Sequence, residues 1–407
     1  MCDAIMGSGK SKSCISFVND NIDKKFIYIT PYLPEAERIA TSCPELHFVQ
    51  PSDKLPEYKL SKLEHTRALM REGRNIASTH AAFRSYTDDM IQSIKANDYI
   101  LLIDEAVDVF REVNYNHSDV QLMVDGGYAE YSDGVYRYTG KEYTGSRLRD
   151  MFEMLRCNNL IPVEKGRTGF QYYYWAFPKE ILCAFRTVYI MTYLFDASEM
   201  KEFIRHYGIE YQYIGIRRDG DTYRFAETME YVPEYVSRLK EYLHIFYNTK
   251  LNQVGKHKMA LSSNWFASHE EERAILKNNM YSFLRYYMNA PGRRILWSTF
   301  DRYVHWLRGR GYSRQNVAFN IKATNSYRDR DILAYCVNIF PTPQKVKFFA
   351  SQGMTYDTDG AALSTMIQWI WRSAIRDGHE IWVYIPSRRM RTLLEDWLDR
   401  LATGGDM

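Results

Sequence analysis

Short apolar segments alternate with longer amphipathic segments along the first part of the chain. The apolar segments have the length and the β-branched and aromatic content of strands, and helical periodicity follows two of them. Because strands separated by crossover helices pair in parallel, the alternation predicts an α/β domain with a parallel sheet. The expected strands are residues 2–6, 26–29, 75–80 and 99–103, and the expected helices are residues 10–21 and 34–42.

The alternation returns near the C-terminus after a helical stretch. Helical periodicity over residues 232–247 and 269–287 predicts a helical bridge at 217–290. A chain of 407 residues exceeds what one hydrophobic core usually serves, so we expect two α/β domains, at 1–216 and 291–407. The expected elements of the second domain are strands at 294–298, 316–321 and 380–385 and helices at 362–376 and 388–401.

A segment of about 75 residues, 111–185, interrupts the first domain. Turn signals predict a short strand at 120–123 and a hairpin within 126–139, and a helix is expected at 146–157. Such an insert could grip or wedge nucleic acid, or it could be an elaboration without a role in function.

Residues 4–11, Ala-Ile-Met-Gly-Ser-Gly-Lys-Ser, have the spacing of a nucleotide phosphate-binding loop. Glycine lets successive backbone N–H groups converge on an anion, and the N-terminus of the following helix favours negative charge. We expect Lys10 to reach the outer phosphates of ATP and Ser11 to hold Mg²⁺. A plain Gly-Ser turn is the alternative. The expected phosphate-binding residues are Gly7, Ser8, Gly9, Lys10 and Ser11.

The apolar segment 99–103 delivers two adjacent carboxylates, Asp104 and Glu105, to the carboxyl edge of the sheet. Asp104 is expected to bind Mg²⁺ through its water shell, and Glu105 to polarise the water that attacks the nucleotide. A strand that ends in Asp-Glu is common by itself. Its combination with the phosphate loop predicts a P-loop nucleotide hydrolase.

A regular set of polar residues, Gln368, Arg372 and Arg376, lies within the expected helix 362–376. Four helical residues advance by about 400°, a drift of about 40° per step, so the three side chains would share one face. Arginine suits phosphate because its fork of donors matches the oxygens and its charge does not titrate. A solvated basic stripe is the alternative.

In order along the chain, these motifs resemble those of superfamily 2 helicases, especially the compact DNA helicases of tailed bacteriophages. Asp104-Glu105-Ala106-Val107 stands at the DExx box, and 368–376 has the pattern Q-x-x-x-R-x-x-x-R. The resemblance implies two tandem RecA-like domains that use ATP and Mg²⁺. It implies catalytic roles for Lys10, Asp104, Glu105, Gln368, Arg372 and Arg376.

The same resemblance implies a nucleic-acid partner. Residues 187–196 look like the family's coupling segment, and five further positions match segments that contact the nucleic-acid backbone. DNA, single-stranded or forked, is favoured over RNA, and replication or recombination proteins are further expected partners. The implied activity is an ATP-dependent DNA helicase or translocase in phage DNA replication or recombination. The five positions are Thr30, Pro31, Thr79, Thr324 and Asn325.

Bulk composition changes this picture little. The balance of 53 Lys+Arg against 50 Asp+Glu gives a net charge of +3, which by itself calls for no polyanionic partner. Residues 291–330 nevertheless carry nine Lys/Arg against two Asp, which is either a phosphate-facing surface or an ordinary solvated face. The six scattered cysteines indicate neither disulfides nor zinc. With no leader pattern and no apolar run near 20 residues, we expect a cytoplasmic protein without a membrane partner.

Two other functions remain open at this stage. A packaging ATPase of the large-terminase type shares the loop and the Asp-Glu pair, but it needs a nuclease domain and leaves the Gln/Arg set unexplained. A non-motor nucleotide switch that recruits a replication partner would hydrolyse nucleotide without response to nucleic acid. The preference for ATP over GTP is a default choice.

Overall fold

Two parallel β-sheets organise the computed structural model, which describes residues 1–58, 61–164, 171–321 and 326–403. The chain divides into two compact units, each described here by itself. The predicted α/β class with parallel sheets is confirmed in both. Unit 1 contains Met1–Asp3, Gly9–Glu230 and Thr342–Tyr356, and unit 2 contains Ala4–Ser8, Tyr231–Pro341 and the chain from Asp357. These limits differ from the expected domains because the chain passes between the units several times.

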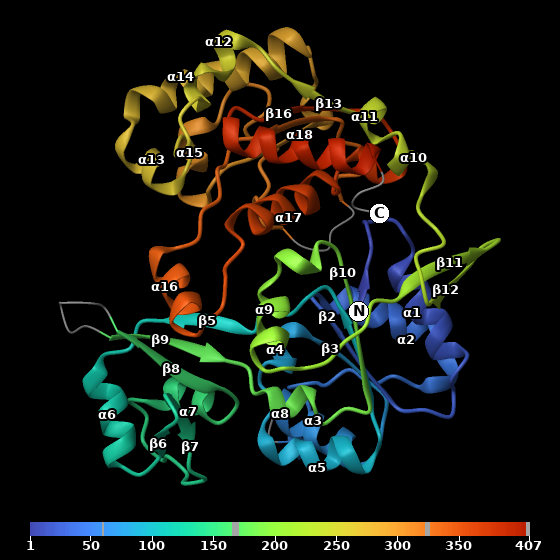
Figure 1. Ribbon diagram of the computed structural model, residues 1–407, viewed down its shortest axis with the longest axis vertical. Coiled ribbons are helices and arrows are strands. Elements are labelled where there is room, and N and C mark those ends of the chain that lie inside the picture. The colour runs from blue at the N-terminus through green and yellow to red at the C-terminus, as the bar shows by residue number, and fades with distance from the viewer. Residues whose placement is uncertain (59–60, 165–170, 322–325, 404–407) are drawn as a thin grey trace. The chain divides into compact units, whose positions relative to one another are not determined.

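The sheet of unit 1 has five parallel strands in the order β1-β10-β4-β2-β3 (Figure 1). Its inner strands are almost wholly apolar and buried, as expected for a parallel sheet with helices on both faces. The strands predicted at 2–6, 26–29, 75–80 and 99–103 are present, whereas a strand expected at 210–216 begins only at Gly215. The strands are β1 (Cys2–Asp3), β2 (Phe26–Thr30), β3 (Ile76–Thr79), β4 (Ile100–Asp104) and β10 (Thr187–Thr192). The helices are α1 (Lys10–Asn19), α2 (Leu33–Ser42), α3 (Lys62–Arg71), α4 (His80–Phe83), α5 (Asp88–Ala96), α8 (Lys179–Leu182) and α9 (Glu199–His206).

Two antiparallel structures are added to this sheet. One is the hairpin of β11 (Gly215–Asp219) and β12 (Thr222–Ala226), which lies beside α1 in Figure 1. The other is the insert, a five-stranded sheet in the order β5-β9-β8-β7-β6. Its elements are β5 (Phe110–Val113), α6 (His117–Asp125), β6 (Ala129–Ser132), β7 (Val135–Tyr138), α7 (Arg149–Leu155), β8 (Asn159–Glu164) and β9 (Gln171–Ala176).

Inside the insert, the predicted hairpin and the predicted helix are present as β6–β7 and α7. The predicted strand at 120–123 is wrong, because these residues belong to α6. Val120 and Met123 are three positions apart and both are buried, which is the spacing of one helix face and not of one strand face. They pack with residues of α7 and β9 in a small core of their own.

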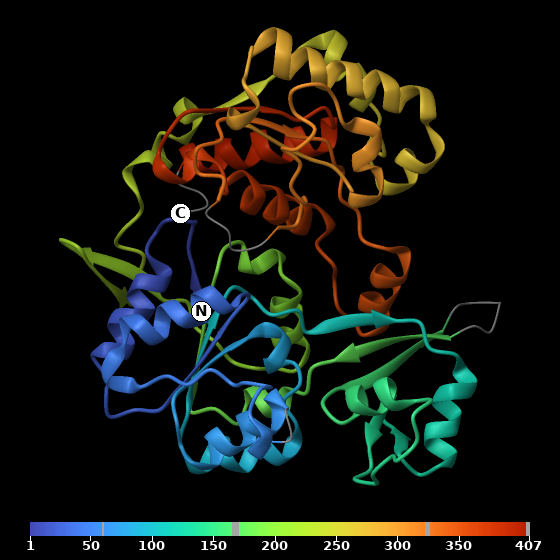
Figure 2. The same cartoon turned by 180° about the vertical axis from the view of Figure 1, so that it is seen from behind.

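The other face of the insert sheet is covered by α16 (Pro343–Ser351), which comes from far along the chain (Figure 2). The rings of Tyr174 and Phe348 are stacked, with centroids 4.0 Å apart and planes at 8°. Next to them, the Tyr172 hydroxyl donates to the carbonyl of Gln344 at 3.5 Å. Since Tyr173 belongs to the core beneath α6 and α7, neighbouring β9 residues serve opposite faces. A helix from the second half of the chain thus completes the core of unit 1.

The sheet of unit 2 has four parallel strands in the order β13-β16-β15-β14. Around it lie a helical layer and a π-helical turn, Ser282–Tyr287, that continues α14. The strands are β13 (Leu243–Phe246), β14 (Ile295–Ser298), β15 (Ile332–Tyr335) and β16 (Ile381–Tyr384). The helices are α10 (Glu234–Ser237), α11 (Leu239–Tyr242), α12 (Thr249–Asn252), α13 (Ser263–Ser268), α14 (Glu270–Tyr281), α15 (Val304–Leu307), α17 (Thr358–Ile370) and α18 (Arg388–Ala402).

Two expectations for this region are wrong. The expected helix 232–247 is divided into α10, α11 and the strand β13, because β13 pairs in parallel with β16 and fills an edge of the sheet. The expected strand 316–321 forms only a single bridge, between Asn316 and Trp297. Residues 243–246 of the expected bridge therefore belong to the second sheet.

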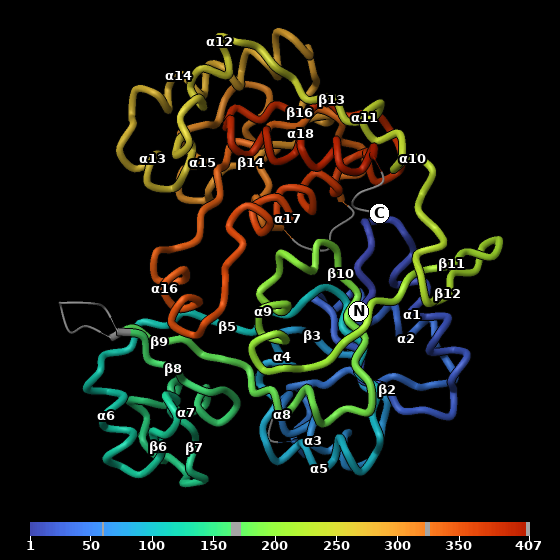
Figure 3. The backbone as a smooth tube through the Cα atoms, viewed as in Figure 1, coloured from blue at the N-terminus to red at the C-terminus, as the bar shows by residue number. Residues whose placement is uncertain are grey.

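The chain leaves unit 2 for α16 and later returns from it (Figure 3). Arg389 of α18 binds residues on both of these passages. Its guanidinium donates to Asn338 Oδ1 at 2.9 Å and to the Ile339 carbonyl at 2.8 Å on the outgoing side. On the returning side it donates to the Thr358 carbonyl at 3.1 Å and to Asp359 at 2.6 Å. One planar group with several donors can hold both passages at once.

No helix within the described ranges is long and apolar enough to cross a membrane.

We expect Phe348→Ala to lower the free energy of unfolding by about 3–5 kcal/mol, because the ring is fully buried and its removal leaves a cavity against Tyr174. Urea unfolding would measure the loss. Val346→Ala is the control, since Val346 lies on the same helix with 45% of its surface exposed. Equal losses in the two variants would contradict the assignment of α16 to the core of unit 1.

Candidate functional site

The connection from β1 to α1 has the backbone of an anion-binding loop. Gly7 and Gly9 both have left-handed φ angles, +86° and +94°. A Cβ on Gly9 would lie 2.1 Å from Cδ1 of Tyr223, so only glycine fits there. The Ser8 hydroxyl is buried and has no hydrogen-bond partner within the described part of the chain. A buried polar atom of this kind at a helix N-terminus fits a loop that binds an oxyanion.

Strand β4 delivers Asp104 beside the first turn of α1. The Ser11 hydroxyl lies 3.5 Å from both carboxylate oxygens, and the Tyr28 hydroxyl donates to Oδ2 at 3.0 Å. At the start of α4, His80 Nε2 lies 2.9 Å from the backbone carbonyl of Asp104. Three elements therefore hold Asp104 in place, α1 and β2 at its carboxylate and α4 at its carbonyl.

Burial controls the charges in this cluster. It raises the pKa of Asp104 to about 6, and the nearby Glu105 carboxylate adds to the rise. The Tyr28 hydrogen bond and the Lys10 charge oppose it. Burial also lowers the pKa of Lys10, against the influence of neighbouring anionic groups. A dication beside Asp104 or a polyphosphate beside Lys10 would offset this desolvation with added opposite charge.

Glu105 has an unusual backbone conformation. Its φ of +64° is left-handed, which costs a residue with a Cβ about 1–2 kcal/mol. Its N–H donates to the Met191 carbonyl at 2.9 Å, which continues the pairing of β4 with β10 and holds the conformation. Strain of this kind clusters at functional sites.

Ser11 and Asp104 together fit Mg²⁺, which prefers oxygen ligands and usually keeps several waters. Among the described residues, no three or more His, Cys, Asp or Glu side chains lie close enough together to hold a metal. In nucleotide sites generally, the other ligands of Mg²⁺ are water and phosphate.

The expected nucleic-acid contacts lie at the same edge of the sheet. Thr30 and Thr79 are register partners at the ends of β2 and β3. Thr30 is fully buried, whereas Thr79 is partly exposed and caps α4 by accepting from the Ala82 N–H. Pro31 is partly exposed. Thr324 and Asn325 lie outside the described residues.

The arrangement expected for Gln368, Arg372 and Arg376 is wrong in one respect, because α17 ends at Ile370. Ser373 is extended and its hydroxyl donates to the Ile370 carbonyl at 2.6 Å, which satisfies the helix end. The next N–H, of Ala374, donates to the Arg330 carbonyl at 2.9 Å and draws the chain away. The three side chains therefore do not share a helix face.

Their surroundings differ accordingly. Gln368 is partly exposed and Nε2 lies 3.4 Å from the Ser364 hydroxyl, while Arg372 is only 8% exposed. Arg376 is partly exposed and lines a pocket of about 410 Å³ in unit 2. Gly7 of the loop between β1 and α1, which also belongs to unit 2, lines the same pocket.

Sequence reasoning missed two residues of this cluster. Tyr28 lies in the predicted strand 26–29, where it looks like a core residue, and His80 ends the predicted strand 75–80. A hydroxyl within a segment that is otherwise apolar is the signal that could have singled out Tyr28, because a buried hydroxyl needs a partner.

Comparison with known proteins places the chain in a family. Residues 237–398 match a family model described as the YonV C-terminal Rossmann-like domain. Over 406 residues the chain is 34% identical to the SPbeta prophage-derived uncharacterized protein YonV of Bacillus subtilis (strain 168), and the match covers 98% of both chains. The chain belongs to the YonV family. The expected resemblance to the compact helicases of tailed phages is not confirmed by these matches, which show a prophage-derived relative.

Two solved structures are also similar to this YonV-family chain. The first, titled Structure of S. tokodaii Xpd4, is 12% identical with a TM-score of 0.49, and the match covers 97% of this chain and 93% of that one. The second, titled XPD_Helicase, is 11% identical with a TM-score of 0.44, over 97% and 94% of the two chains. Because both identities and both TM-scores are low, we assign no site or activity to this chain from either structure.

We expect Asp104→Asn to stabilise the metal-free, nucleotide-free protein, and more so as the pH rises. The pKa of Asp104 is raised from 3.8 to about 6, so its ionisation opposes folding above pH 6 and not below pH 4. The gain should grow between these values to at most about 3 kcal/mol. Urea unfolding in EDTA at pH 4.5 and 7.5 measures it, with Asp221→Asn, which changes a fully exposed carboxylate, as the control. A gain independent of pH would refute the raised pKa.

Proposed function

We propose that this chain is an ATP-dependent DNA translocase or helicase. The observation that carries the proposal is the Ser11 hydroxyl facing the Asp104 carboxylate at 3.5 Å, at the N-terminus of the helix that carries Lys10. A hydroxyl, a carboxylate and a lysine in this relation are what hydrolysis of a nucleoside triphosphate requires of a P-loop.

In this proposal the residues divide the work of hydrolysis. Lys10 neutralises the outer phosphates, and Ser11 and Asp104 hold Mg²⁺. When bound, this ion would supply positive charge that stabilises the negative charge developing on the phosphate oxygens. Glu105 orients the attacking water. Tyr28 and His80 keep Asp104 in place through its side chain and its carbonyl, respectively.

Coupling to DNA is the second part of the proposal. The ends of β2 and β3, with Thr30, Pro31 and Thr79, are proposed to contact the backbone of single-stranded or forked DNA, and so are Thr324 and Asn325. ATP-driven opening and closing of two RecA-like domains would then move the protein along the strand. The prophage origin of the YonV relative supports a role in phage DNA replication or recombination, with other proteins of those processes as partners.

The deciding experiment measures ATP turnover without nucleic acid and with single-stranded DNA, duplex DNA or RNA. We expect stimulation by single-stranded DNA above that by RNA.

Lys10→Ala should abolish turnover in every condition, because the loop loses the charge that meets the outer phosphates. Glu105→Gln should keep nucleotide binding and lower turnover by about 10²-fold or more. If the ATP turnover of the wild type does not change when nucleic acid is added, a nucleotide switch is favoured. Mn²⁺-dependent cleavage of DNA would favour a terminase.

Arg376 is proposed to stabilise charge on the transferring phosphoryl group. Its place in a pocket lined also by Gly7 supports the proposal. Arg376→Ala should lower turnover at saturating DNA by about 10³-fold, with a much smaller loss of nucleotide affinity, and Arg376→Lys should not restore turnover. Arg388→Ala, at an exposed arginine of unit 2, is the control. If the loss instead falls on DNA affinity, Arg376 is a nucleic-acid contact.

A further inference from the structure

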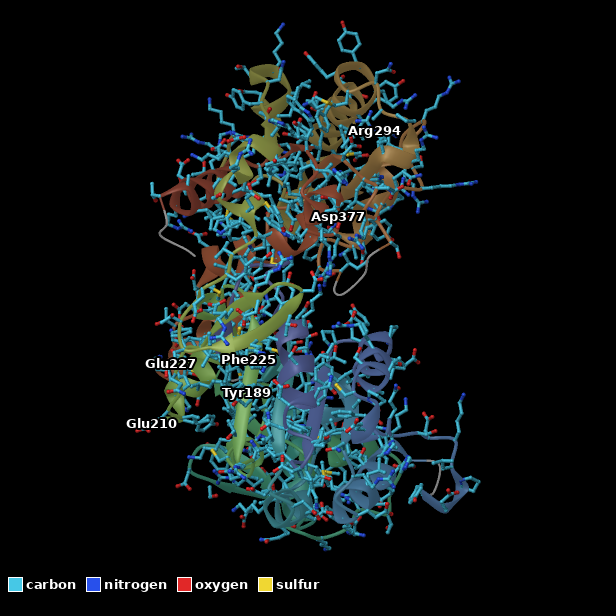
Figure 4. The ribbon with its side chains drawn as sticks, turned by 90° about the vertical axis from the view of Figure 1, so that its right-hand side faces the viewer. Tyr189, Glu210, Phe225, Glu227, Arg294 and Asp377 are labelled. Carbon is cyan, nitrogen blue, oxygen red and sulfur yellow. The ribbon has the colours of Figure 1, made fainter. Side chains whose placement is uncertain are left out.

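The β11–β12 hairpin is fastened along α1. Phe225 contacts Phe17 with ring centroids 5.9 Å apart and stacks on Tyr189 of β10 at 5.5 Å and 11° (Figure 4). The next residue back, Arg224, forms an ion pair with Asp20 at the C-terminal end of α1. These contacts fix the hairpin to the helix that begins the candidate nucleotide site.

A second group of hairpin residues reaches the other end of α1, where the phosphate loop passes into the helix. Tyr223 is 8% exposed and its ring lies directly against Gly9. The Lys12 ammonium lies over this ring, 4.7 Å from the centroid, and the Arg218 guanidinium lies 5.4 Å from it. Because Arg218 and Tyr223 are register partners, the hairpin presents them side by side.

The first turn of α1 therefore has different neighbours on its two sides. Ser11 faces Asp104, whereas the next residue, Lys12, faces Tyr223. Metal and terminal phosphates belong on the Ser11 side, where the carboxylate lies. A nucleotide held there by its terminal phosphates has its nucleoside end free to extend toward the opposite side, along Lys12.

We propose that Arg218, positioned by the buried ring of Tyr223, forms the nucleoside side of this site and contacts the base, the ribose or the phosphate nearest to it. This inference rests on the proposed function. The chemistry fits, because 39% of the Arg218 side chain is exposed and guanidinium donors bind phosphate oxygens and the acceptor edges of bases. The hairpin thus supplies selectivity for a nucleotide over a bare polyphosphate.

The test compares binding of Mg·ATP with binding of Mg·tripolyphosphate, which has the phosphates without the nucleoside. Titration calorimetry on the full chain would include wild type, Arg218→Ala, Tyr223→Ala and Tyr223→Phe. The matched control is Arg217→Ala, which removes the same charge from the neighbouring position of β11, where Arg217 pairs with Asp219. We expect Arg218→Ala and Tyr223→Ala to weaken ATP binding roughly tenfold or more relative to the control, as for loss of one charged contact. Tripolyphosphate binding should change less than about twofold, and Tyr223→Phe should keep most of the ATP affinity.

Other outcomes overturn the inference in recognisable ways. If Arg218→Ala leaves ATP affinity at the level of the control, or if both probes weaken by the same factor, the hairpin only supports the loop. In that case ATP binding by wild type that is lost in Lys10→Ala still upholds the proposed function. If wild type binds neither probe, or if Lys10→Ala binds both as wild type does, the phosphate-loop assignment and this inference fall together.

Discussion

The buried carboxylate of Asp104 is the constraint on which the site depends. Desolvation disfavours the ionised form of this carboxyl group and raises its pKa to about 6. The surrounding groups must therefore offer hydrogen bonds or positive charge to the carboxylate. Tyr28 donates from β2, Ser11 faces it from α1, and Lys10 adds a positive charge. Since these elements are held by the parallel register of the sheet, a shift of β4 against β2 would separate all of them.

The structure brings distant parts of the chain together around the sheet of unit 1. The insert, read from sequence as a nucleic-acid wedge or an inert elaboration, has a packing role, since its sheet holds α16 through the stacked Tyr174 and Phe348. The β11–β12 hairpin closes over the first turn of α1 in a similar way. Arg389 then fixes the passages that lead the chain to α16 and back.

Two misread segments show where local pattern was insufficient. The helical period through 362–376 is real up to Ile370, but the Ser373 hydroxyl and the Arg330 carbonyl offer the backbone other partners. Likewise, the segment that becomes β13 has helical spacing, yet an edge of the second sheet gives it a ladder of hydrogen bonds. In both cases a hydrogen-bond partner distant in sequence outcompetes a weak local preference.

The sequence by itself determined the parallel sheet of unit 1, the glycine loop between β1 and α1, and the Asp104–Glu105 pair at the sheet edge. These follow from local facts: apolar strand segments, glycines at positions that need φ > 0, and the alternation of strand and helix. Only the tertiary structure decided that Tyr28 and His80 hold Asp104, that α16 belongs to unit 1, and that Tyr223 lies on Gly9. Each of those contacts joins residues far apart in the chain, and their side chains carry no local pattern that distinguishes them from core or turn residues. Packing between segments, which no short stretch of sequence contains, makes that choice.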